Sequence, residues 1–235
     1  MRKLVIFLLL VVSFQFLSYG QSIKERFKGQ DKLIYEVYYN GMFSGHIYWS
    51  YKGTEKVEGG LADVIHVSSD TKILGLLDLT SDEDVFLDSE NHLPLKVKRN
   101  IVMFGKKELI DEIYDQGKGF VRLIIRGDEA REEIISQDKP IHNILALLYF
   151  FPQNVKLEKD RWMNFNLPTQ KIKIKFIKER PLKTDTGEVD TYFLIGRGAK
   201  RFSLWMDKVT RMPLRLEFVS LLGKVSIVRA EENQP

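Results

Sequence analysis

The fold is decided by one stretch, DKPIHNILALLYFF at residues 138–151, because it is the one substantial helix that the sequence predicts. Asp138 is a suitable N-cap, since its carboxylate can accept hydrogen bonds from the unpaired N–H groups of a first turn. Pro140 falls in that turn, where proline removes no intrahelical donor. Pro152 disfavours the α conformation of the residue before it, and is therefore predicted to end the helix.

Apolar side chains surround this predicted helix after its first turn. One face carries four of them at the i, i+3, i+4 and i+7 positions, namely Ile141, Ile144, Leu145 and Leu148. Another face carries Leu147, Tyr149 and Phe150. A helix that is apolar all round needs cover on more than one side. We therefore assign the face with Leu148 to a surrounding sheet, and the second face to a ligand-binding cavity or its rim.

The remainder of the chain reads as short strands separated by turns. Residues 32–39 are rich in β-branched and aromatic residues, as strands are, and Asn40-Gly41 after them is a strong turn signal. Residues 171–178 alternate lysine with apolar side chains, which is typical of a strand with one face in solvent. Turn signals recur about every 8–12 residues, as in antiparallel sandwiches and barrels. The sequence predicts a mainly β fold, an antiparallel curved sheet or partly open β-barrel with one principal helix packed in its concavity.

The first 20 residues are typical of a secretory signal peptide. Arg2 and Lys3 supply positive charge, residues 4–17 are an apolar run, and Ser18-Tyr19-Gly20 is a cleavage site with small residues at both ends. The apolar run is shorter than the roughly 20 residues that span a bilayer, which makes an uncleaved anchor the less favoured alternative. We expect cleavage after Gly20 and a single β-rich domain over residues 21–235. The expected location is the periplasm, with secretion or outer-membrane association as alternatives.

Charge and cysteine content exclude several classes of protein. The formal net charge of +4 falls by two when Arg2 and Lys3 are removed, so the sequence argues against a nucleic-acid-binding protein, which would carry a clustered basic face. The chain has no cysteine, which excludes a disulfide, a thiolate metal site and a lipid-anchoring cysteine. At this length a domain can bury a sizeable core without cross-links. We expect a monomer.

The sequence contains no motif for catalysis or for a cofactor. The four histidines are not spaced as metal ligands, and of them only His142, near the start of the predicted helix, is a candidate for a functional role. Two acidic clusters, at residues 82–84 and 185–190, offer carboxylate oxygens for calcium, but solvated turns are the favoured interpretation because neither cluster has the spacing of a ligand loop. The sequence therefore predicts no enzyme, no cofactor and no metal.

Aromatic residues are the more informative feature. Ten of them crowd the first predicted hairpin and the later strands: Tyr35, Tyr38, Tyr39, Tyr48, Trp49, Tyr51, Trp162, Phe165, Phe202 and Trp205. They are consistent with a large β core, and also with a curved sheet that encloses an apolar ligand. Strand alternation points Trp205 away from Leu204 and Met206, and we predict that Trp205 is buried in the core.

Several short motifs, taken in their order, resemble DUF3108, a family of exported bacterial proteins of unknown function. They are Leu33-x-Tyr35-x-Val37-x-x-Asn40-Gly41-x-x-x-Gly45, Asp138 followed by Ala146–Phe151, Gly187 before a strand, and Trp205-Met206-Asp207 followed by Arg211–Arg215. The last quarter of the chain, from Leu204 to Val225, is also similar to periplasmic lipoprotein carriers of the LolA and LolB type. This resemblance implies a half-open β-barrel with an apolar cavity, although those carriers have several helices where this chain has one.

Three functions from different classes follow. The first is a non-enzymatic periplasmic binding or carrier protein for an apolar or amphipathic envelope molecule such as a lipid, with an envelope protein as a further partner. The second is a structural or interaction module of the envelope with a filled core and no small ligand. An envelope hydrolase is the least favoured, because no nucleophile–base pair can be named. A cavity against the helix would favour the first, solid packing the second, and convergent polar residues in a cleft the third.

Overall fold

The computed structural model describes residues 32–230 apart from positions 59, 74–76, 104, 155 and 221–222. The signal peptide expected at residues 1–20 lies outside the described residues, so cleavage after Gly20 and a single domain over 21–235 stay predictions. Within the described part of the chain, no helix combines the length and the apolar character that crossing a bilayer requires.

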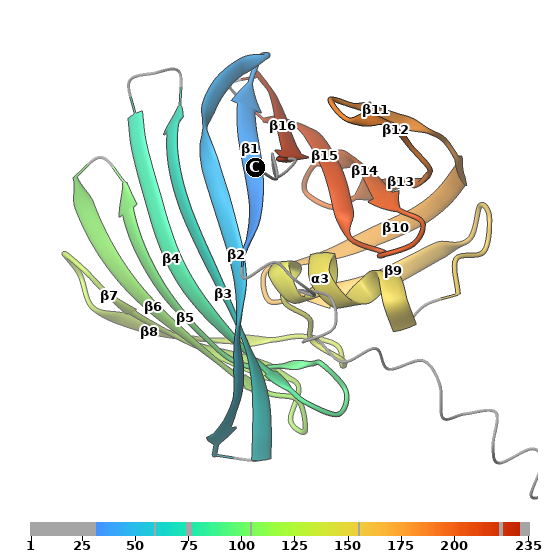
Figure 1. Ribbon diagram of the computed structural model, residues 1–235. Helices are drawn as coiled ribbons and strands as arrows, with labels where there is room; N and C mark the ends of the chain where they lie inside the picture. The colour runs from blue at the N-terminus through green and yellow to red at the C-terminus, as the bar shows by residue number, and fades with distance from the viewer. Residues whose placement is uncertain are drawn as a thin grey trace, which may run out of the picture.

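The first eight strands form an antiparallel meander, which we call the N-terminal wing (Figure 1). Its strands are β1 (Leu33–Tyr39), β2 (Met42–Val57), β3 (Gly60–Ile73), β4 (Leu77–Asp88), β5 (Pro94–Met103), β6 (Lys106–Asp115), β7 (Phe120–Arg126) and β8 (Arg131–Ser136). The helix α3 (Ile144–Asn154) follows β8.

The strands after the helix form a second, shorter half of the same sheet, which we call the C-terminal wing. They are β9 (Trp162–Leu167), β10 (Gln170–Glu179), β13 (Thr191–Arg197), β14 (Arg201–Asp207), β15 (Pro213–Ser220) and β16 (Gly223–Arg229). A small separate hairpin, β11 (Leu182–Thr184) with β12 (Gly187–Val189), interrupts them. Antiparallel pairing of β1 with β16 joins the wings into one 14-stranded sheet whose edges are β8 and β9.

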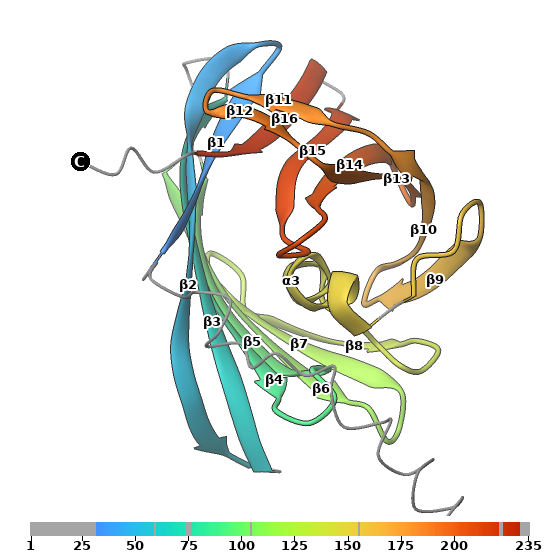
Figure 2. The same ribbon diagram turned by 45° about the vertical axis from the view of Figure 1, so that its right-hand side comes forward.

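The sheet curves around α3 and stays open between its two edges (Figures 1 and 2). Residues 137–143, which we call the crossing segment, run from the end of β8 toward β9 and are hydrogen-bonded to both wings. Toward β9, the backbone N–H of His142 donates to the carbonyl of Asn166 at 2.6 Å, and Gln137 Nε2 donates to the carbonyl of Leu167 at 3.0 Å. Toward the N-terminal wing, the backbone N–H of Gln137 donates to the carbonyl of Gly119 at 2.9 Å. The mainly β, partly open barrel with a helix in its concavity is therefore confirmed.

The predicted helix bounds were wrong at both ends. The helix begins at Ile144, where Asn143 Oδ1 accepts hydrogen bonds from the N–H groups of Leu145 at 2.9 Å and Ala146 at 3.3 Å. Asp138 is not the cap, because its carboxylate pairs with Lys171 and the backbone after it is hydrogen-bonded to Gln116 and to β9 before the helix begins. The helix also continues past Pro152 to Asn154, since the φ angle of proline fits a helix even though it lacks the N–H.

The helix packs against both wings and divides the core. Ala146 and Tyr149 belong to a cluster with side chains of the N-terminal wing, among them Trp49, Ile65 and Val85. On the other side, Leu147 belongs to a cluster formed by β9, β10, β13 and β14, whose members include Leu194, Leu204 and Met206.

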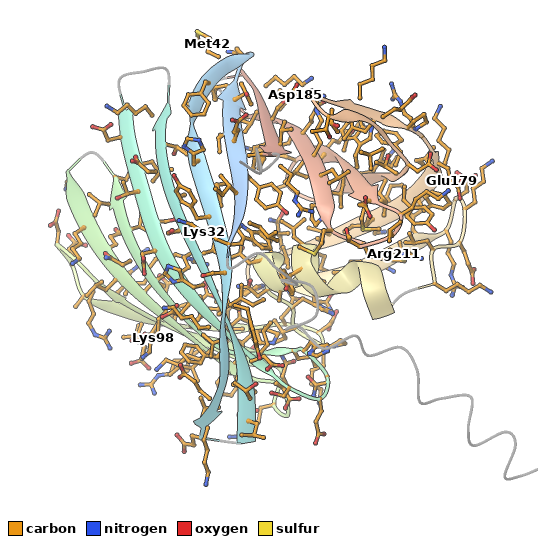
Figure 3. The ribbon with its side chains drawn as sticks, viewed as in Figure 1. Lys32, Met42, Lys98, Glu179, Asp185 and Arg211 are labelled. Atoms are coloured by element: carbon orange, nitrogen blue, oxygen red, sulfur yellow. The ribbon has the colours of Figure 1, made fainter. Side chains whose placement is uncertain are left out.

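Trp205 is buried as predicted, with 9% of its surface exposed, but the prediction that it lies in the core was wrong, because Leu204 and Met206 face the core instead. Its ring lies on the opposite face of β14 from Leu204 and Met206, at 4.9 Å between centroids from Phe193 and beneath the guanidinium of Arg215. The hairpin β11–β12 runs along this outer side of the C-terminal wing (Figure 2), and Asp185 at its turn approaches β1 (Figure 3). Trp205 is therefore buried outside the concavity that holds the helix.

Candidate functional site

Two cavities lie beside the helix inside the concavity. The larger has a volume of about 570 Å³ and the smaller about 170 Å³. Leu148 from α3 and Leu216 from β15 line both, so these two side chains separate one cavity from the other. The larger volume falls within the roughly 300–1,000 Å³ that small-molecule pockets occupy.

The larger cavity is enclosed by both wings and by the start of the helix. Its apolar walls are Ile110, Leu123 and Ile125 from the N-terminal wing, Ile144 and Leu148 from α3, and Leu167, Ile172, Phe202, Leu216 and Phe218 from the C-terminal wing. The turns at residues 168–170 and 198–200 form its rim, with the exposed Lys200 among them. The walls of the larger cavity are therefore mostly apolar, and its polar side chains lie on one wall and at the rim.

The smaller cavity lies between the helix and the strands around β1. Its lining includes Tyr35, Trp49 and Leu145, with Ser69, Ser81 and Glu83 as polar members. The Tyr35 hydroxyl donates to the carbonyl of Pro213 at 3.1 Å, and burial raises the pKa of Tyr35 to about 12, so this hydroxyl stays neutral. Ser69 and Ser81 are hydrogen-bonded to each other at 2.9 Å.

A row of charged side chains crosses the inner face of the N-terminal wing between the two cavities. Arg99 Nε donates to Glu83 Oε2 at 2.7 Å, and Arg99 Nη1 donates to Glu112 Oε1 at 2.9 Å. Tyr114 donates to Glu112 Oε2 at 2.5 Å, and Asn143 Nδ2 lies 3.5 Å from the Tyr114 hydroxyl. Arg99 and Glu112 line the larger cavity, while Glu83 lines the smaller, so the trio of Glu83, Arg99 and Glu112 faces both.

Burial and charge act in opposition on this row. The side chains of Glu83 and Glu112 are only 14% and 8% exposed, and that of Arg99 is 20% exposed. Burial by itself lowers the pKa of Arg99, but the neighbouring carboxylates of Glu83 and Glu112 outweigh it and hold the pKa above its ordinary value. Burial, reinforced by the Glu112 carboxylate, raises the pKa of Tyr114. The guanidinium therefore stays charged, and Tyr114 remains a donor.

The sequence did not single out this row. Glu83 belongs to the acidic cluster at residues 82–84, which was interpreted as a solvated turn; that was wrong, because the cluster lies within β4. Asp84 points to the outer face, where it contacts Lys52 at 2.7 Å and His66 at 2.9 Å. The alternation of inward and outward side chains along a strand could have indicated this row. Arg99 on β5 and Glu112 on β6 occupy inward positions, where an apolar side chain is expected.

The second acidic cluster matches its interpretation only in part: Asp185 lies in the turn of the β11–β12 hairpin, whereas Glu188 lies in β12. His142 is half-buried, its ring lies edge-on to Phe165 at 5.3 Å between centroids, and burial lowers its pKa. Over the described ranges, no group of three or more histidine or acidic side chains is placed to hold a metal ion.

The helix faces are the reverse of the expected assignment. Leu148, assigned to the sheet, lines both cavities. Tyr149, assigned to the cavity, is fully buried and stacks on Trp49 with 6.1 Å between ring centroids, and Leu147 is 6% exposed in the core of the C-terminal wing. Neither lines the two cavities, because helix rotation is set by packing against both wings. The side chain of Phe150 lies outside the described part of the structure, and ligand binding by Leu147, Tyr149 or Phe150 stays a prediction.

Fold and cavities together define a β-barrel-like protein whose open sheet wraps around one helix. No protein-family model and no curated protein matches the sequence. Among solved structures, the chain is similar to a β-barrel-like protein of domain of unknown function DUF1849 from Brucella abortus, with a TM-score of 0.57 and 6% sequence identity over 85% of this chain and 95% of that chain. At this identity the likeness shows the fold alone.

The chain is also similar to a putative outer membrane lipoprotein-sorting protein domain from Vibrio parahaemolyticus. That similarity has a TM-score of 0.26 and 11% identity over 92% of this chain and 90% of that chain, and at this TM-score it supports no conclusion. Neither protein is described as an enzyme. The more specific resemblance to DUF3108 stays a prediction.

Proposed function

We propose that this chain is a non-enzymatic periplasmic binding or carrier protein for an apolar or amphipathic molecule of the cell envelope, such as a lipid. The observation that carries the proposal is the cavity of about 570 Å³, walled by apolar side chains, against Leu148. The periplasmic location rests on the signal peptide expected at residues 1–20. A monomeric state, an envelope protein as partner and membership of DUF3108 belong to the same proposal.

The apolar walls can supply the affinity of a carrier. Each methylene group moved from water into an apolar site contributes about 0.8 kcal/mol, so about ten methylenes contribute roughly 8 kcal/mol. That free energy corresponds to a micromolar dissociation constant before the entropic cost of ordering the ligand is subtracted. Affinity of this order permits both loading and release.

The two other classes of function have less support. A scaffold with a filled core would show solid packing where the larger cavity lies. A hydrolase that acts through a serine needs a base hydrogen-bonded to that serine, whereas Ser69 and Ser81 in the smaller cavity are hydrogen-bonded to each other. The polar groups that converge on Arg99 and Glu112, in the larger cavity, are hydrogen-bonded to one another.

Uptake of the uncharged fluorescent probe N-phenylnaphthylamine tests the proposal. The purified protein is expected to raise the probe fluorescence saturably. Ala199→Trp places a large side chain at the rim of the larger cavity and is expected to weaken binding about tenfold or more. Val209→Trp is the matched control, because Val209 is 89% exposed and lines neither cavity.

Failure of the wild-type protein to bind any apolar probe would contradict the carrier function. Probe binding that Ala199→Trp leaves unchanged would place the ligand elsewhere in the molecule.

A further inference from the structure

The inner face of the N-terminal wing carries an excess of negative charge next to the apolar cavity. The trio has two carboxylates and one guanidinium, so its formal charges sum to one negative charge. Arg99 is held from both sides, by Glu83 at 2.7 Å and by Glu112 at 2.9 Å. Because both neighbours of the guanidinium are carboxylates, it is neutralised in place and offers little attraction to an anionic ligand.

The carboxylates retain capacity for further donors. An ionised carboxylate has about four acceptor sites. In the described structure, side chains donate once to Glu83, from Arg99, and twice to Glu112, from Arg99 and Tyr114. Glu112 is also nine-tenths buried, with 8% of its side chain exposed, so an additional donor from a ligand would meet it in a poorly solvated site where charge is weakly screened.

The rim carries the opposite charge. Lys200 is the other cationic residue that lines the larger cavity, and it lies in the exposed turn between β13 and β14. Solvent and salt screen such a charge far more than one on the cavity wall. The buried negative charge is therefore expected to outweigh Lys200 in choosing which polar group of a ligand enters.

We propose that the cavity selects amphipathic ligands whose polar group is an amine or another hydrogen-bond donor, and disfavours those with an anionic group, through the trio of Glu83, Arg99 and Glu112. This inference rests on the proposed carrier function. In the bound state the ligand chain lies along the apolar walls, and its donor group lies against Glu112. The positive charge of an amine would balance the excess carboxylate.

Displacement of N-phenylnaphthylamine by three amphiphiles of equal carbon number tests the inference. Dodecylamine, dodecanol and dodecanoate differ in the polar group; the alkyl chain of dodecanoate is also one methylene shorter, which by itself weakens its binding only about fourfold. Below their micelle-forming concentrations, dodecylamine is expected to bind on the order of ten- to a hundredfold more tightly than dodecanoate, with dodecanol between them. Equal binding of amine and carboxylate, or a preference for dodecanoate, would overturn the inference.

Two substitutions test whether the preference for the amine comes from the trio or from Lys200 at the rim. Glu112→Gln keeps the shape of the side chain and removes its charge, and it is expected to lower the amine-to-carboxylate ratio about tenfold or more. Lys200→Ala is the control at the rim and should leave the preference for the amine in place. A ratio that Glu112→Gln leaves unchanged would contradict the role of the trio.

The outcome separates this inference from the carrier function. If the wild-type protein binds no neutral probe, the carrier function itself fails. If it binds the neutral probe but does not distinguish amine from carboxylate, the carrier function stands and the selectivity fails. Because the wild-type series needs no variant, the test holds even if Glu112→Gln fails to fold.

Discussion

Both wings line the cavities with apolar side chains, but only the N-terminal wing adds buried charged side chains. The N-terminal wing presents the charged trio and the hydrogen-bonded pair Ser69–Ser81 on its inner face. The C-terminal wing presents apolar side chains, with Leu204 and Met206 buried in its core and Phe202 and Leu216 at the cavity. In the strands of both wings, successive side chains point to opposite faces of the sheet. On β5, for example, Arg99 lines the larger cavity, whereas Lys98, labelled in Figure 3, lies on the outer face. This difference is the basis of the proposal that the N-terminal wing selects the polar group of a ligand, while apolar side chains of both wings hold its chain.

The largest loss of stability is expected from substitutions in the buried charged trio of the N-terminal wing. Arg99→Met leaves two buried carboxylates without their shared partner and should lower the free energy of unfolding by about 3–5 kcal/mol. The triple variant Glu83→Leu, Arg99→Met, Glu112→Leu removes the whole trio and should recover most of that loss. Urea denaturation compares the two, and a triple variant as unstable as Arg99→Met would contradict the account.

Trp205 tests the outer face of the C-terminal wing, where the stabilisation is apolar. Trp205→Ala should cost about 3–5 kcal/mol, because the side chain is 9% exposed and packs on Phe193. Binding of the neutral probe should persist in the fraction that stays folded, since Trp205 lies outside the concavity. A loss below about 1 kcal/mol would show that the ring contributes no more than a surface residue.

A smaller difference in stability is expected between truncating a leucine in the core and truncating one in the cavity wall. Leu204 is 1% exposed, so Leu204→Ala should cost about 2–5 kcal/mol. Leu148 is only partly buried and borders both cavities, so Leu148→Ala should cost about 1 kcal/mol while changing the probe affinity. Thermal melts with and without probe measure both quantities. Equal, severe destabilisation by the two substitutions would make the Leu148 face part of a filled core.

The smallest change in stability is expected from Asp84, on the outer face of the N-terminal wing. Burial tends to raise the pKa of Asp84, but Lys52 and His66 outweigh it and hold the pKa below its ordinary value of 3.8. Because the pKa of Asp84 is lower in the folded state than its ordinary value of 3.8, the ionised carboxylate stabilises the fold fully above pH 3.8. This stabilisation is lost as the pH falls through the folded-state pKa. Asp84→Asn should therefore cost within about 1 kcal/mol near neutral pH, and the difference from wild type should shrink near pH 3. Urea melts at both pH values check this, and a difference that grows in acid would contradict the sign.

The sequence predicted what local patterns determine. The apolar run over 144–149 marked the helix, the lysine alternation over 171–178 marked β10, and the position of Trp205 indicated its burial. The helix start was missed because long-range contacts compete with capping: the crossing segment is hydrogen-bonded to both wings, and Asn143, already inside the predicted helix, becomes the cap.

The site could be predicted only in part, since it depends on strand register. Glu83 meets Arg99 because β4 and β5 pair in the register that places them opposite, and Glu112 lies on the next strand. No spacing along the chain encodes that meeting. The helix faces were reversed for the same reason, because two wings far apart in sequence set the direction of Leu148 and Tyr149.

The most direct test of the carrier account is native mass spectrometry of the protein purified from its own cell envelope, followed by extraction of whatever it holds. The account predicts a mass above that of the polypeptide, with the excess released on denaturation as an amphipathic molecule that carries an amine or another donor group. A bare polypeptide mass, together with no uptake of N-phenylnaphthylamine by the same preparation, would contradict it.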